Sequence, residues 1–72
     1  MANLKDEYLL RAERCVIVGE LCVTRQTMLI VRLAARGLDI TEAEKILETF
    51  MQRLAFMYKH LQYLRDEYDV LP

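Results

Sequence analysis

The chain has 72 residues and a formal net charge of −1, with ten Lys and Arg residues against eleven Asp and Glu residues. Apolar residues make up 54% of the sequence and charged residues 29%, unlike disordered or collagen-like chains. The near-zero net charge also disfavours a wholly basic nucleic-acid-binding module, because no net positive field attracts phosphate. A chain this short builds only a small core, so its apolar surplus predicts contact with another molecule.

We expect a cytoplasmic protein without membrane insertion. The N-terminal segment has neither the basic region nor the apolar region of a secretory signal. Residues 15–35 are the most apolar stretch, but Glu20, Arg25 and Arg32 interrupt it. Each such charge at the centre of a membrane helix opposes insertion by about 2.5–3.5 kcal/mol.

A heptad pattern predicts a helix over about residues 4–36. Apolar or small residues recur at alternating spacings of three and four, which places them on one helical face. This first series comprises Leu9, Ala12, Val16, Gly19, Val23, Gln26, Ile30 and Leu33. A second apolar series lies about a third of the circumference away, so one neighbouring helix cannot cover both. The second series comprises Leu10, Ile17, Leu21, Met28, Val31, Ala35 and Leu38.

The same helix carries two cysteines, Cys15 and Cys22. They lie seven residues apart, about 10 Å along a helix, which is too far for a disulfide with each other. We favour two free thiols in a reducing compartment. A disulfide between copies of the chain is the other interpretation.

Residues 37–40 form the one predicted turn. Gly37 can adopt the left-handed conformation that ends a helix, and Leu38 can supply the accompanying apolar contact. Two capping boxes compete for the start of the next helix, namely Asp39 with Glu42 or Thr41 with Glu44.

A second heptad pattern predicts a helix over about residues 41–69. Its apolar series comprises Ala43, Leu47, Phe50, Leu54, Met57, Leu61, Leu64 and Tyr68. Polar residues gather on the opposite side, as expected of a solvent-exposed back. They are Lys45, Glu48, Gln52, Lys59 and Asp66.

The predicted fold is an all-α, antiparallel two-helix hairpin that resembles a coiled coil. Two helices alone leave much apolar surface exposed to water. We therefore expect a four-helix-bundle dimer or a higher oligomer, in which the hairpins dock in parallel or antiparallel orientation. The predicted intrachain core comprises Val16, Gly19, Val23, Ile30, Leu33, Leu47, Phe50, Leu54, Met57, Leu61 and Leu64. The predicted oligomer or partner interface comprises Leu10, Ile17, Leu21, Met28, Val31, Met51 and Tyr58.

A row of arginines on the first helix supports an alternative function. Five arginines project within about 60° of one another and could lie against phosphates. They are Arg11, Arg14, Arg25, Arg32 and Arg36. A nucleic-acid-binding bundle would use Arg25, Arg32 and Arg36. The other interpretations are a solvated face, or arginines that pair with acids of a neighbouring helix.

No pattern predicts an enzyme, a cofactor or a metal site. His60 is the sole histidine, and Glu67, two turns away, is too far to orient it as a general base. The sequence has neither a Glu-x-x-His pair nor a phosphate-binding glycine loop. We therefore expect His60 to lie at the edge of the helix–helix contact without a catalytic role.

One set of residues between positions 12 and 64 matches the pattern of a known family, namely Ala12, Glu13, Arg14, Val16, Gly19, Val23, Gln26, Ile30, Leu33, Gly37, Asp39, Glu42, Ala43, Leu47, Phe50, Leu54, His60 and Leu64. Through these residues the chain resembles a family of short helical-hairpin proteins common in rhizobia and related alphaproteobacteria. The resemblance implies a helical hairpin and no established activity. The chain departs from the pattern at positions where charged residues are usual, namely Val18, Leu21, Cys22, Met28 and Met51, and at Met57, where the family commonly has His.

These patterns together predict a non-enzymatic interaction module that self-associates through its apolar heptad series. The expected partner is a second copy of the chain, with another helical protein as a further partner.

Overall fold

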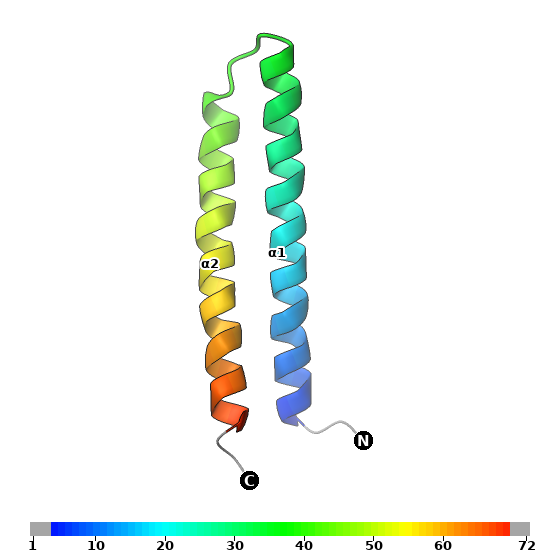
Figure 1. The fold of residues 1–72 in the computed structure, drawn as a ribbon, viewed down its shortest axis with the longest axis vertical. Helices are drawn as coiled ribbons and strands as arrows, with labels where there is room; N and C mark the ends of the chain where they lie inside the picture. Colours follow the sequence, from blue (N-terminus) through cyan, green and yellow to red (C-terminus); the bar gives the residue numbers. More distant parts are fainter. Residues whose placement is uncertain (1–3, 70–72) are drawn as a thin grey trace.

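The computed structural model describes residues 4–69, with side chains as far as Glu67. This part of the chain consists of helix α1, Leu4–Ala35, and helix α2, Thr41–Asp69. The helices lie side by side in antiparallel directions and are joined by one short loop (Figure 1). The Cα atoms span 57 × 21 × 12 Å, so the molecule is a flat layer of two helices with two broad faces. The predicted all-α hairpin is confirmed.

Helix α1 ends in a Schellman motif. The N–H of Leu38 donates to the carbonyl of Leu33 at 3.0 Å, and the N–H of Gly37 donates to that of Ala34 at 3.0 Å. Gly37 has a φ of 71°, in the left-handed region that glycine enters without steric cost. Because Leu38 remains exposed, backbone hydrogen bonds rather than apolar burial hold this end.

Asp39 caps the start of α2. Its Oδ1 accepts hydrogen bonds from the Thr41 N–H at 2.9 Å and from the Thr41 hydroxyl at 2.7 Å. These bonds hold the pKa of the Asp39 carboxyl below its usual value, because they stabilise its charged form. The Glu42 carboxylate lies 3.5 Å from the Lys45 ammonium. Of the two competing caps, Asp39 is therefore the one whose side chain makes the capping hydrogen bonds in the described residues.

The core between the helices is thin. Ala12, Val16 and Leu61 form its buried cluster, against which half-buried apolar side chains pack. None of the large side chains described is fully buried. The residues expected in the intrachain core are all buried or half-buried, namely Val16, Gly19, Val23, Ile30, Leu33, Leu47, Phe50, Leu54, Met57, Leu61 and Leu64. The side chain of Tyr68, which closes the predicted series of α2, lies outside the described set.

Two residues set how closely the helices approach. A Cβ added at Gly19 would lie 3.0 Å from Leu54 Cδ1 and 3.1 Å from Met57 Sδ, so the absence of a side chain permits this contact. Gln26 is buried, and its Nε2 donates a hydrogen bond of 2.9 Å to the carbonyl of Ala43. This bond ties the middle of α1 to the first turn of α2.

Candidate functional site

Acidic side chains gather on one broad face of the hairpin. Arg65 lies 3.6 Å from Glu13, and Tyr58 pairs with Glu20 one heptad further along α1, so these edges of the two helices adjoin. Beyond them lies a groove of about 660 Å³, which is lined by Thr27 of α1 and by two acidic residues of α2, Glu44 and Glu48. The acidic face is defined by Asp6, Glu13, Glu20, Glu44 and Glu48, with Arg65 as its basic residue.

Five of the seven residues predicted for an oligomer or partner interface border this acidic face, whereas Leu21 and Met28 lie on the outer edge of α1, opposite its contact with α2. Ile17 lies one turn from both Glu13 and Glu20, and Met51 lines the groove. The predicted set is between 45% and 64% exposed and comprises Leu10, Ile17, Leu21, Met28, Val31, Met51 and Tyr58. The hairpin therefore brings exposed apolar side chains from both helices to the same side.

Tyr58 is coupled to the acidic face electrostatically. Partial desolvation at the edge of the helix–helix contact raises the pKa of its hydroxyl, and the hydrogen bond to the Glu20 carboxylate raises it further. Desolvation and the neighbouring carboxylate both disfavour the ionised, phenolate form of Tyr58. Tyr58 therefore remains a neutral hydrogen-bond donor at pH 7.

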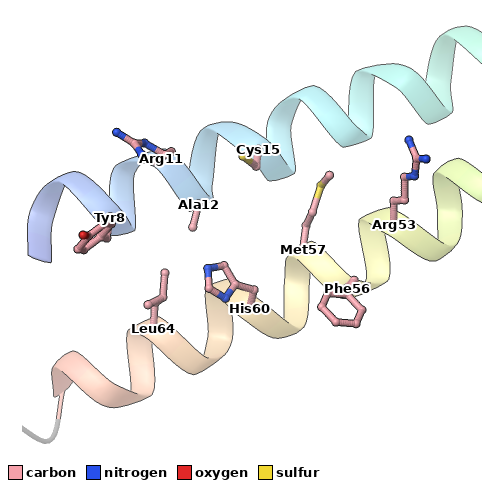
Figure 2. Close-up of a pocket in the computed structure, with 9 residues that line it drawn as sticks. All are labelled: Tyr8, Arg11, Ala12, Cys15, Arg53, Phe56, Met57, His60 and Leu64. Atoms are coloured by element: carbon pink, nitrogen blue, oxygen red, sulfur yellow. The ribbon is translucent and has the colours of Figure 1, made fainter.

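A larger groove of about 800 Å³ lies on the opposite face. Figure 2 shows Ala12 pointing from α1 toward α2, with Leu64 and Met57 pointing back toward α1. Its remaining lining residues are Tyr8, Arg11, Cys15, Arg53, Phe56 and His60. The floor of the groove is apolar, and an arginine from each helix borders it.

Four of the five arginines of the predicted row lie on this same side, whereas Arg14 lies toward the outer edge of α1, seven residues before Leu21. Arg25 and Arg32 follow Arg11 at multiples of seven residues, and Arg36 follows the groove residue Cys15 in the same way. Arg53 joins them from α2, which analysis of a single helix could not detect. The basic face is defined by Arg11, Arg25, Arg32, Arg36 and Arg53, with Glu42 and Glu67 as its acidic residues.

Exposed aromatic side chains accompany these arginines. Phe56 is 77% exposed beside Arg53, and Tyr63 follows it one heptad later on α2. Tyr8 lies on the same side of α1. These aromatics come mainly from α2, so the pattern of arginines on α1 alone does not predict them.

His60 lines the basic groove at the edge of the helix–helix contact and is exposed. Cys15, also exposed, lies in the same groove, and both Cys15 and Cys22 are free thiols. Within the described residues, no group of three or more His, Cys, Asp or Glu side chains is arranged to hold a metal ion. Neither described helix is long and apolar enough to cross a membrane.

Two placements differ from the sequence-based expectation. Glu48 and Gln52 were expected on the solvent-exposed back of α2, but both line the groove on the acidic face, with Glu48 deeper on that face. For Glu48 the reason is that a residue one position after a core residue, here Leu47, projects toward the face of the layer rather than its outer edge.

Comparison with protein-family models, curated proteins and solved structures finds no match for the chain. The resemblance to the rhizobial helical-hairpin proteins therefore stays a prediction.

Proposed function

We propose that this hairpin is a non-enzymatic protein-interaction module whose first partner is a second copy of itself. The observation that carries the proposal is the imbalance between a thin core and a large exposed apolar surface. The buried apolar residues described are Ala12, Val16, Ala43 and Leu61, whereas many larger apolar side chains are between 42% and 77% exposed.

The total surface area supports association. The chain exposes 6017 Å², whereas a compact protein of 8.5 kDa exposes about 4,650 Å². The excess of about 1,400 Å² exceeds the roughly 800 Å² that each partner buries in a standard interface. Self-association would remove this surface from water and add the second layer of helices that a bundle core requires.

The proposal assigns no catalytic step, cofactor or metal to the chain. Its two free thiols suit a reducing compartment, so we place the protein in the cytoplasm. Another helical protein with an exposed apolar face is a second class of partner, since the same exposed residues would serve it.

Light scattering coupled to size-exclusion chromatography tests self-association. We expect a mass above that of one chain at micromolar concentration. Ile17→Glu and Met51→Glu place charges among the exposed apolar side chains and should each raise the dissociation constant roughly tenfold or more, equivalent to about 1.4 kcal/mol. Lys59→Glu, on the outer edge of α2, is the control and should leave the mass unchanged. A folded wild-type monomer would contradict the proposal.

Nucleic-acid binding is a second candidate function, favoured by the arginines and aromatics on the basic face. Arginines would contact phosphates while Phe56 and Tyr63 stack on bases. Binding to a structured RNA should weaken steeply with salt and should be lost when Arg25, Arg32 and Arg36 are replaced by Gln. Binding that survives this triple replacement would remove the candidate site.

A further inference from the structure

The two faces of the hairpin carry opposite charge. The acidic face has five carboxylates and one arginine, whereas the basic face has five arginines and two carboxylates. Each face also has its own groove and its own exposed apolar side chains, such as Ile17 and Met51 on the acidic face and Phe56 and Tyr8 on the basic face. Both faces therefore resemble halves of an interface.

This segregation bears on how two copies can meet. A two-fold dimer pairs the same face of both copies, which brings like charges together on either face. A heterologous contact pairs one face with the opposite face of the next copy and brings unlike charges together. Like charges placed across an interface disfavour association, whereas complementary charges favour it and set its orientation.

We propose that copies of this chain associate heterologously, with the acidic face of one hairpin packed on the basic face of the next. This inference rests on the self-association proposed above and specifies its geometry. Glu44 and Glu48, which border one groove, would face the side on which Arg11 and Arg53 border the other.

The exposed area agrees with the use of both faces. A single standard interface removes about 800 Å² from each partner and leaves part of the roughly 1,400 Å² excess exposed. A heterologous assembly covers both faces of every interior copy. Such contacts form a ring if the rotation between copies closes, and otherwise an open-ended stack.

Charge reversal on each face provides the test. One variant combines Arg11→Glu with Arg53→Glu on the basic face, and a second combines Glu20→Lys with Glu48→Lys on the acidic face. The control combines Lys45→Glu with Lys59→Glu on the outer edge of α2, which changes the net charge by the same amount as the basic-face variant. Circular dichroism establishes that each chain remains helical, and sedimentation velocity measures its assembly.

We expect each face variant alone to lose wild-type assembly, because its two faces then no longer carry opposite net charge. An equimolar mixture of the two variants should restore pairing between the unchanged acidic face of one variant and the unchanged basic face of the other, in a species that contains both chains in equal amounts. This result also shows that neither variant is misfolded. The control should assemble like the wild type, and higher salt should weaken wild-type assembly because it screens the complementary charges.

Several results would overturn this geometry. If the basic-face variant assembles like the wild type, the contact does not use that face, although self-association itself stands. If that variant also loses binding to a fluorescent RNA, the basic face is a nucleic-acid interface instead. A mixture that does not restore assembly would show that the two faces do not pair. A folded monomeric wild type would overturn both this inference and the proposed function.

Discussion

Gln26 offers a test of the helix–helix contact that is independent of assembly geometry. The side chain is 9% exposed, and its Nε2 donates to the Ala43 carbonyl at 2.9 Å. Gln26→Glu keeps the size and shape of the side chain but replaces the amide donor with a titratable oxygen. A protonated carboxyl can still donate to Ala43, whereas a carboxylate cannot and faces the carbonyl oxygen instead.

Burial and the lost donor both disfavour the charged form, so the pKa of the introduced carboxyl should rise by about one to two units in the folded state. At pH 7 this shift lowers the free energy of unfolding by about 1.4–2.7 kcal/mol relative to pH 4. The sign follows from the direction of the pKa shift. A carboxyl whose pKa is raised in the folded chain contributes stability that is fully present below its unfolded pKa of about 4.3. This stability is lost as the pH rises through the folded pKa. Each kcal/mol corresponds to about 4–8 °C in melting temperature for a domain of this size.

Thermal unfolding at pH 4 and pH 7, at one protein concentration, measures the difference between variant and wild type. Two controls separate the causes. Gln26→Leu removes the bond without a titratable group, so its difference from the wild type should not depend on pH. Lys59→Gln changes the net charge by the same amount at an exposed position on the outer edge of α2 and should change stability little. A Gln26→Glu variant as stable as the wild type at pH 7 would refute this account of the contact.

The two glycines and the cap of α2 give three further tests by thermal unfolding. Gly19→Leu should destabilise the hairpin by about 1–3 kcal/mol or more, because even a Cβ there lies within 3.1 Å of Leu54 and Met57 atoms. No loss of stability would mean that the helices do not approach closely at this point. Gly37→Ala should cost about 1–2 kcal/mol through its left-handed backbone, and Gly37→Asn should cost less. Equal losses in these two variants would contradict a left-handed cap. Asp39→Ala should lower the melting temperature above pH 3.8, because the lowered pKa of Asp39 supplies stability that disappears as the pH falls through its folded value. A deficit that persists unchanged well below pH 3.8 would point to a cause other than the carboxylate.

The sequence was sufficient to predict the hairpin because its two periodic signals are local. Alternating spacings of three and four depend only on residues within one helix, and the left-handed cap depends on Gly37 and its neighbours. The choice of Asp39 as the cap of α2 required the hydrogen bonds to Thr41.

The composition of the two faces could not be predicted in the same way. Arg53 and Phe56 join Arg11 only when the register between the helices is known, and the same holds for Glu44 and Thr27 on the other face. Counted along the chain, residues 1–36 carry six basic and four acidic residues, and residues 37–72 carry four basic and seven acidic residues. In the folded hairpin the charge is instead divided between two faces to which both helices contribute. The bond from Gln26 to Ala43 was equally hidden, since it joins residues on different helices.

The most direct test of the central claim is the dependence of thermal unfolding on protein concentration. If this thin hairpin is completed by other copies of itself, dilution must destabilise it, because association binds the folded chain and not the unfolded one. We predict a melting temperature that rises steadily with concentration across the micromolar range. A melting temperature that does not change with concentration, together with the mass of a single chain by light scattering, would contradict the account.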